Sequence, residues 1–180
     1  NLKTIIGKYF YEHSTQDINK TIDINANAPM LITHAFLEGM LAKNSGHVCN
    51  IASSGGLISN PKMSVYVASK WALIGWSDSL RLEMKKLNKK IHVTTIMPYY
   101  INTGMFDGVN SKIPILKPEA AALTIFKAIL KNKKMVTIPG YMYRFIKLGQ
   151  AFMSINFFDW FAGSFLGIYS TMEKFTGREK

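Results

Sequence analysis

The sequence has one cysteine, Cys49, among its 180 residues, which excludes a disulfide framework. Its four histidines, at positions 13, 34, 47 and 92, share no ligand spacing with one another or with Cys49, so we expect no metal site. The N-terminal residues do not show the apolar run and small-residue cleavage site of a secretory signal. We therefore expect a cytoplasmic protein whose fold depends on an apolar core.

Acidic residues are scarce, because 11 Asp and Glu stand against 22 Lys and Arg and leave a formal net charge of +11. Such an excess can attract nucleic acid, anionic lipid or an anionic cofactor. The lysines gather in "MKKLNKK" (84–90) and "LKNKK" (130–134), at the ends of helix-like runs, where cations favour the helix dipole. No arginine-rich block, zinc-finger spacing or basic region followed by heptads is present, so we expect no nucleic-acid partner.

Long low-complexity stretches and internal repeats are also missing, and helical and extended patterns alternate along the chain. Ser14 and Asp17 have the spacing of a capping box at the start of a long apolar-periodic helix. Short apolar runs bounded by turn residues indicate buried strands. The expected order is helix 14–43, strand 47–53, helix 63–88, strand 91–98, a helix from Pro118, and strand 134–138. This order predicts one α/β domain with a parallel sheet buried on both faces.

A tyrosine and a lysine stand in the otherwise largely apolar run of the second expected helix, "SVYVASKWALIG" (64–75). Tyr66 and Lys70 are four residues apart, so their side chains project from the same helix face. An ammonium near a phenol favours the phenolate and lowers the pKa of the tyrosine, which would suit a general acid/base. Ser53 follows a buried strand, at the sheet edge where open α/β folds bind ligands, and could hydrogen-bond a substrate oxygen.

The spacing of Ser53, Tyr66 and Lys70, thirteen and then four residues apart, resembles the active-site signature of the short-chain dehydrogenase/reductase superfamily. The similarity extends over residues 10–140. It includes "DINANAP", which aligns Asn25 with an asparagine of the family, and "PYYINTG", which supplies Pro98 and Thr103. The resemblance implies a Rossmann-like, doubly wound parallel sheet, with residues 1–148 as the catalytic part. It also implies hydride transfer between NAD or NADP and an alcohol or ketone.

The resemblance assigns a role to each matching residue. Tyr66 would exchange the hydroxyl proton as general acid/base, Ser53 would hold the substrate oxygen, and Lys70 would bind the nicotinamide ribose. Asn25 would hold a water in a proton relay; Pro29, four residues on, has no N–H to donate to the Asn25 carbonyl, although a plain proline kink would leave the same pattern. The expected cofactor-binding residues are Tyr66, Lys70, Pro98, Ile101 and Thr103. Tyr99 stands where the family usually has glycine.

No segment has the G-x-G-x-x-G spacing after a strand that cradles a dinucleotide phosphate, and no position selects NAD over NADP. The sequence therefore resembles the C-terminal two-thirds of such an enzyme, with the N-terminal strands and the glycine-rich loop absent from this chain. The alternative is a non-catalytic fragment, a lipid- or protein-interaction module that keeps the motif without the cofactor-binding half.

The C-terminal part has a looser similarity to the branch containing epidermal-type retinol dehydrogenases and 17β-hydroxysteroid dehydrogenases. It rests on "TGMF" (103–106) and "GIYSTMEKFTG" (167–177). This resemblance implies a lipophilic alcohol or ketone substrate of the retinoid, steroid or long-chain alcohol class. The expected substrate pocket comprises Ser53, Met105, Phe106, Tyr141 and Phe145.

Residues 149–180 form an apolar extension. The stretch 151–172 approaches the length of a membrane span, but Asn156 and Asp159 interrupt it. This pattern is equally compatible with two arrangements. In one, an interfacial helix makes peripheral membrane contact through 149–172; in the other, the segment packs on the body of the fold or on a second subunit.

A stripe of small residues on the second expected helix would let another backbone approach closely: Ala68, Ala72, Gly75 and Ser79. The resemblance implies a homodimer through the two long helices.

Overall fold

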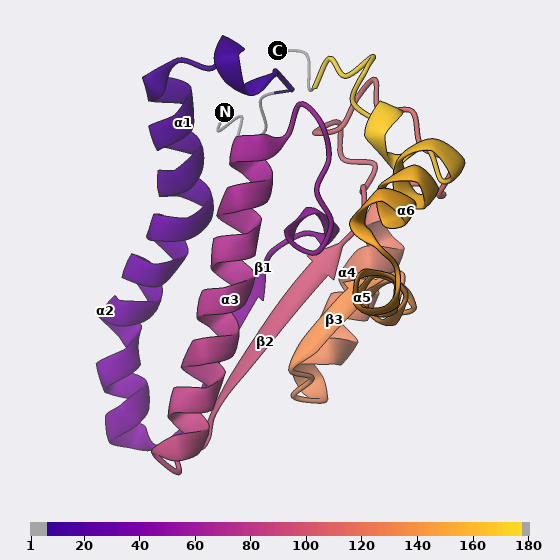
Figure 1. Ribbon diagram of the computed structural model, residues 1–180. Coiled ribbons are helices and arrows are strands. Elements are labelled where there is room, and N and C mark those ends of the chain that lie inside the picture. Colours follow the sequence, from indigo (N-terminus) through magenta and orange to yellow (C-terminus); the bar gives the residue numbers. More distant parts are fainter. Residues whose placement is uncertain (1–6, 178–180) are drawn as a thin grey trace.

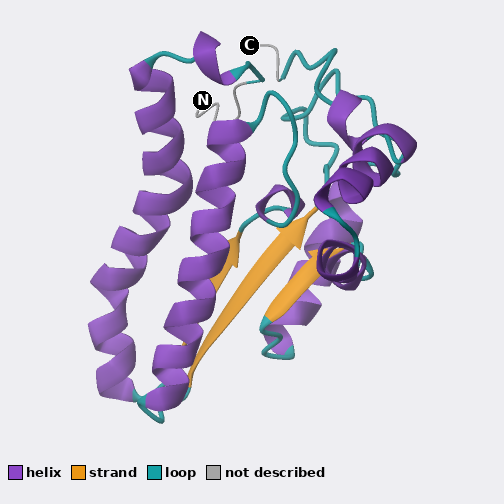
Figure 2. Cartoon of the chain, in the orientation of Figure 1, coloured by secondary structure: helices purple, strands orange, loops and turns teal. Residues whose placement is uncertain are grey.

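The computed structural model describes residues 7–177 as an α/β fold around a parallel sheet (Figures 1 and 2). The strand order is β1-β2-β3. The main elements are α1 (Thr15–Ile22), α2 (Ala28–Lys43), β1 (Gly46–Ile51), α3 (Ser64–Lys86), β2 (Ile91–Pro98), α4 (Pro118–Leu130), β3 (Met135–Ile138), α5 (Met142–Phe152) and α6 (Ile155–Asp159). Short π or 3-10 segments are η1 (Phe10–Glu12), η2 (Asp23–Asn27), η3 (Ser54–Gly56), η4 (Trp160–Phe165) and η5 (Ile168–Ser170). The predicted order of helices and parallel strands is confirmed.

The N-terminal helical rod contains a π segment that the sequence did not predict. It begins as expected, since Ser14 Oγ accepts from the Asp17 N–H at 3.1 Å and the Asp17 carboxylate accepts from the Ser14 N–H at 3.3 Å. Between α1 and α2, the segment η2 widens by one residue, so the Ala28 N–H bonds to the Asp23 carbonyl. The widening lies just before Pro29, which cannot donate a backbone hydrogen bond. It accommodates the proline and keeps α1, η2 and α2 in one continuous rod.

Helices cover both faces of the sheet. Figure 1 shows α2 and α3 along one face, with α4 behind β2 and β3 on the other. Ile96 and Met97 are adjacent on β2, point to opposite faces, and are both 0% exposed. Ile96 packs with Ala128 of α4, whereas Met97 packs with Leu73 of α3. Burial on both faces is the arrangement expected of a doubly wound parallel sheet.

The C-terminal region consists of several short helical segments. One of the two alternatives predicted from the sequence, a single interfacial helix in this region, is therefore not observed. The α5 helix ends at Phe152, Ser154 caps α6, and Gly167, with a positive φ of 70°, precedes η5. Within the described residues, no helix is long and apolar enough to cross a membrane. Ala162 and Ile168 are buried in the same core cluster as Leu73 and Met97, so this region packs on the body of the fold.

Candidate active site

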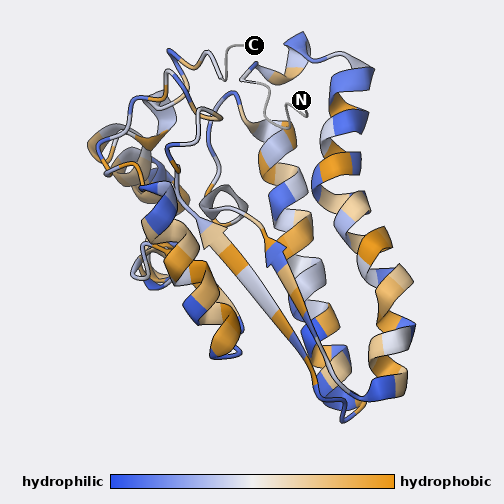
Figure 3. Ribbon diagram, turned by 180° about the vertical axis from the view of Figure 1, so that it is seen from behind, coloured by the Kyte–Doolittle hydropathy of each residue, from blue (hydrophilic) through white to orange (hydrophobic). Residues whose placement is uncertain are grey.

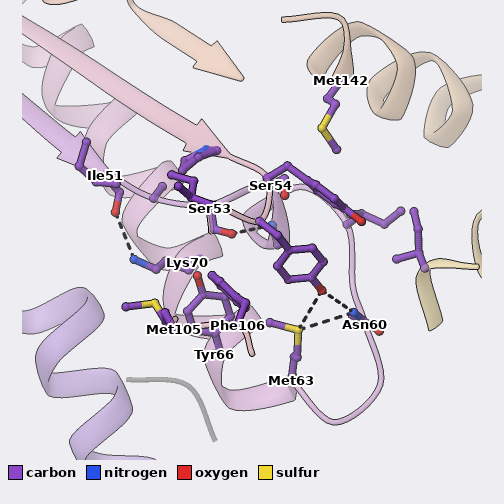
Figure 4. A pocket seen from close by; sticks show the side chains of 18 of the residues that line it. Ile51, Ser53, Ser54, Asn60, Met63, Tyr66, Lys70, Met105, Phe106 and Met142 are labelled. Carbon is purple, nitrogen blue, oxygen red and sulfur yellow. Dashed lines mark hydrogen bonds between the residues drawn. The ribbon is translucent and has the colours of Figure 1, made fainter. Parts of the chain in front are cut away.

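A cavity of about 260 Å³ opens where β1 and β2 end at their carboxyl termini (Figure 4). Open α/β sheets bind ligands in crevices at this edge. Its walls come from the loop after β1, the start of α3, the loop after β2, and single residues of α5 and η5. Residues expected at the site from the sequence that line it are Ser53, Tyr66, Lys70, Pro98, Ile101, Thr103, Met105 and Phe106.

Ser53 lies at the exit of β1, where the chain turns towards α3. Its backbone is extended, and its Oγ accepts a hydrogen bond from the Gly55 N–H at 3.1 Å. Gly56 lets this turn approach α3, because a Cβ there would lie 2.8 Å from the Lys70 carbonyl oxygen. The turn therefore fixes Ser53 in the cavity wall beside the first turns of α3.

Tyr66 projects from the first turns of α3 and is 6% exposed. Burial raises the pKa of Tyr66 to about 12, a nearby Tyr100 adds to the rise, and a hydrogen bond with Ser53 opposes it. The sequence predicted a lowered pKa through Lys70. That prediction is wrong for this arrangement, because burial of the phenol is the largest cause of the shift and Lys70 is not among its causes.

Lys70 is one helical turn beyond Tyr66 and shares its face of α3. Its Nζ donates to the Ile51 carbonyl at 3.1 Å and lies 5.7 Å from the centroid of the Tyr66 ring. Burial lowers the pKa of Lys70 to about 8. The amine is thus held between the end of β1 and the tyrosine, with its donors at one end of the cavity.

Asn25 lies in η2, is 5% exposed, and is not among the residues that line the cavity. Its Nδ2 donates to Ser69 Oγ at 3.1 Å, and Ser69 Oγ donates to the Tyr66 carbonyl at 2.6 Å. The structure therefore ties Asn25 to the backbone of Tyr66 through Ser69, behind the α3 face that carries the hydroxyl.

The loop after β2 carries Tyr99 at the position where the resemblance suggests glycine. The Tyr99 N–H bonds to the Ile138 carbonyl at 2.8 Å, and its buried ring places the hydroxyl 2.8 Å from Ser111 Oγ. Tyr99 is not among the residues with positive φ, so the position makes no demand for glycine. Beyond it, the Thr103 N–H bonds to the Ile101 carbonyl at 2.8 Å and closes a tight turn at the cavity rim.

A sequence profile described as short chain dehydrogenase matches residues 4–114, which is more than half of the chain. The chain belongs to the short-chain dehydrogenase family.

Relatives with known names match over the whole chain or most of it. Epidermal retinol dehydrogenase 2 of Mus musculus is 35% identical over 185 residues, covering 100% of this chain and 59% of the relative. Retinol dehydrogenase 10 of Rattus norvegicus is 35% identical over 150 residues, covering 79% of this chain and 44% of the relative. The chain thus spans about three-fifths of the length of the former.

Solved structures agree on the fold. A short-chain dehydrogenase/reductase from Burkholderia phymatum in complex with NAD gives a TM-score of 0.68 at 18% identity, covering 81% of this chain and 62% of that one. A short-chain dehydrogenase from Streptomyces avermitilis gives a TM-score of 0.68 at 23% identity, covering 89% and 66%.

The sequence analysis of this short-chain dehydrogenase chain missed part of the cavity wall. It also expected two residues in the substrate pocket that do not line the cavity. Tyr141 and Phe145 lie outside the cavity and are 60% and 45% exposed. The inward face of α5 instead contributes Met142, which the helical spacing with Ile146 and Gly149 could have indicated. Ser54, next to Ser53 at the strand end, also lines the cavity. The other lining residues that were not expected are Ile51, Ala52, Gly55, Ile58, Asn60, Met63, Tyr99, Tyr100 and Ile168.

Asn60 is a further polar residue of the cavity wall. Its Nδ2 donates to Thr171 Oγ1 at 2.8 Å and to the Tyr100 hydroxyl at 3.3 Å. Thr171 Oγ1 donates to the Ile168 carbonyl at 2.8 Å, so its proton is committed and it accepts from Asn60. This network joins the loop before α3 to the C-terminal region. No local pattern in the sequence indicates this network, because Asn60 and Thr171 are far apart along the chain.

Proposed function

We propose that this chain is the catalytic part of an oxidoreductase that transfers a hydride between NAD or NADP and a lipophilic alcohol or ketone. The observation that carries the proposal is the convergence of Ser53, Tyr66 and Lys70 at one end of a largely apolar cavity. A hydroxyl, a phenol and an amine at such a place suit proton transfer to and from a substrate oxygen.

The three polar residues would divide the work at the substrate oxygen. Tyr66 would give its proton to the oxygen in ketone reduction and take it back in alcohol oxidation. Ser53 would donate a hydrogen bond to the same oxygen and hold it near the Tyr66 hydroxyl. Lys70 in its ammonium form would favour the phenolate of Tyr66 when the proton is transferred, and this support would be present below its pKa of about 8 and decline above it. Asn25, through Ser69, would position Tyr66.

A nicotinamide cofactor would supply the hydride acceptor or donor. The cavity wall fits such a group, because Lys70 offers ammonium donors and Pro98, Ile101 and Thr103 form the rim beside it. We expect Lys70 to bind the ribose hydroxyls and the turn from Pro98 to Thr103 to contact the carboxamide. The sequence does not decide between NAD and NADP.

A lipophilic substrate fits the remaining wall. Met63, Met105, Phe106, Met142 and Ile168 supply flexible and aromatic apolar surface around the polar end. The relatives that are named retinol dehydrogenases support the same class of substrate. We include retinoids, steroids and long-chain alcohols in this class.

The test is a substrate screen with the protein at its full natural length. All-trans-retinol, a hydroxysteroid, a long-chain alcohol and ethanol would each be offered with NAD and with NADP, and the reduced nicotinamide would be followed by absorbance. We expect turnover with at least one lipophilic alcohol and much less with ethanol. Absence of both nicotinamide binding and turnover of any alcohol would favour the alternative, a non-catalytic interaction module.

We also propose a homodimer through α2 and α3. The small residues Ala68, Ala72, Gly75 and Ser79 are all exposed on α3, and a Cβ at Gly75 would meet nothing within 4 Å. On α2, Leu31, Ile32 and Phe36 are 69%, 60% and 64% exposed. Gly75→Trp should produce monomers in analytical ultracentrifugation, whereas Glu119→Trp on α4 should not. An unchanged sedimentation profile for Gly75→Trp would contradict this interface.

The region 149–172 is proposed to make peripheral membrane contact. Its buried residues anchor it to the body, while Phe152, Ile155 and Trp160 are 84%, 80% and 53% exposed. Exposed aromatic and aliphatic side chains of this kind favour the headgroup layer of a bilayer. Phe152→Ser combined with Ile155→Ser should reduce flotation with phosphatidylcholine vesicles. Equal flotation of both proteins would contradict the contact.

A further inference from the structure

A second concave surface, separate from the candidate active site, lies along the outer edge of β3. This groove of about 930 Å³ shares no lining residue with the cavity described above. Residues of α3, α4, β3 and α5 form its walls. Its charged lining consists of Arg81, Lys127, Lys131, Lys133, Lys134 and Arg144, with Asp78 as the single carboxylate.

The positive charge of the groove is left largely uncompensated. Asp78 is already paired, since its Oδ1 lies 2.6 Å from a terminal guanidinium nitrogen of Arg81 and accepts from Nε at 2.8 Å. Across residues 7–177, no carboxylate forms an ion pair with any of the other five cations. Lys131, Lys134 and Arg144 are exposed. Cations gathered in a concave surface raise the local potential, so the groove attracts an anionic partner.

The helices on either side of the groove expose apolar side chains. On α4, Leu123, Phe126 and Leu130 are 51%, 58% and 66% exposed. Figure 3, seen from behind, shows this apolar colouring on α4. The same helix contributes Lys127 and Lys131 to the groove. The helix therefore carries exposed hydrophobic residues beside the cations that line the groove.

The α5 helix has the same character. Tyr141, just before it, and Phe145, Leu148 and Phe152 on it are 60%, 45%, 57% and 84% exposed, whereas Met142, Ile146 and Gly149 face the core. Arg144 on this helix lines the groove. Apolar side chains beside cations on one surface helix are typical of elements that lie in a membrane interface. An acidic peptide would use the cations but would have no need of these apolar rows.

We propose that this groove, with the exposed sides of α4 and α5, docks on a bilayer that contains anionic lipid. The cations bind headgroup phosphates and carboxylates while the apolar residues of α5 enter the headgroup layer. The proposal rests on the peripheral membrane contact proposed above and extends it with a lipid preference. A second copy of the chain fits poorly, since a two-fold contact through this groove would set five unpaired cations against five others.

The test measures partitioning of the full natural protein between buffer and vesicles by co-sedimentation. Vesicles of phosphatidylcholine alone are compared with vesicles that also contain phosphatidylserine. Lys131→Glu combined with Lys134→Glu removes two cations from the groove. Lys20→Glu combined with Lys90→Glu makes the same change of net charge at exposed positions outside the groove.

The wild-type protein should bind phosphatidylserine vesicles more tightly than neutral ones, and the difference should shrink with added salt. Each groove cation removed should weaken binding to anionic vesicles about fivefold, so the groove double variant should lose at least about 25-fold. The control should lose much less, because its charges lie away from the docking surface. Equal losses in both variants, or equal wild-type binding to the two kinds of vesicle, would overturn the proposal.

Two further measurements distinguish this lipid-docking proposal from an acidic-peptide site and from the proposed oxidoreductase function. Preferential capture of poly-glutamate over phosphatidylserine vesicles would assign the groove to an acidic peptide and overturn the lipid assignment. Turnover of a lipophilic alcohol in detergent should be the same for the groove variant and the wild type. If neither the wild type nor the groove variant turns over a lipophilic alcohol, the oxidoreductase function is contradicted, and the result of the vesicle experiment still stands.

Discussion

Replacing Lys70 by methionine should stabilise the protein while it removes an essential group from the site. Burial lowers the pKa of Lys70 from 10.5 to about 8, so the ammonium destabilises the folded state at pH 7. At about 1.4 kcal/mol per pKa unit, this amounts to at most about 3.5 kcal/mol. Methionine keeps the unbranched stem but loses the hydrogen bond of the charged amine to the Ile51 carbonyl, which is worth about 1.5 kcal/mol. The net gain at pH 7 is about 2 kcal/mol.

The pH dependence identifies the cause. Between the folded pKa of about 8 and the unfolded value of 10.5, the unfolded chain binds more protons at Lys70 than the folded protein does, so stability rises with pH. The advantage of Lys70→Met should therefore shrink by about 2 kcal/mol between about pH 7 and pH 9.5. Subtracting the free energy of unfolding of the wild type from that of Lys70→Met at each pH cancels the contribution of the other titrating groups.

The assay is urea unfolding of the full natural protein, without nicotinamide, at several pH values. The control is Lys90→Met, because Lys90 is exposed and its side chain makes no contact with the cavity. It should change stability little and independently of pH. A Lys70→Met protein that is less stable than the wild type at pH 7, or a difference that does not change with pH, would refute the reasoning.

Two further substitutions test the packing around the site. Gly56→Ala should lower the unfolding temperature and disturb the cavity, because the new Cβ would press on the Lys70 carbonyl and the Ile74 side chain. The control is Gly55→Ala, whose Cβ would have its nearest neighbouring atom at 3.5 Å. It should leave the unfolding temperature nearly unchanged. Equal unfolding temperatures of Gly56→Ala and Gly55→Ala would contradict this close approach. Leu73 is 2% exposed in the core behind the cavity, so Leu73→Ala should lower the free energy of unfolding in urea by about 2 to 5 kcal/mol. A loss below about 1 kcal/mol would show a loosely packed core.

Local patterns in the sequence predicted much of the fold. Ser14 and Asp17 predicted the start of the first helix, and the apolar run 91–98 coincides with β2. These features depend on neighbours within a few residues. The π segment η2 could not be derived this way, because the local signal, Pro29, is equally compatible with a kink, and the choice depends on how the rod packs against α3.

The candidate site shows the same limit. The spacing of Ser53, Tyr66 and Lys70 predicted their convergence, since a strand end and one helix face fix all three. The direction of the Tyr66 pKa shift could not be predicted, because it depends on how deeply the fold buries the phenol and, to a smaller extent, on the charge of Tyr100, which is distant in sequence. Met142 was missed, and Phe145 on the same helix was expected in the cavity but lies outside it. The spacing of Met142, Ile146 and Gly149 could have indicated the buried face of α5, but only the packing of α5 on the body brings that face to the cavity.

The central claim, that Tyr66 moves the proton at the substrate oxygen, is tested most directly by Tyr66→Phe in the full natural protein. The ring and its packing remain, and only the hydroxyl is lost. The account predicts that turnover of a lipophilic alcohol falls about 10²- to 10⁴-fold while nicotinamide binding by fluorescence is retained. Tyr11→Phe, at a ring 83% exposed and outside the cavity, should keep full turnover. Turnover of Tyr66→Phe within a fewfold of the wild type would contradict the account.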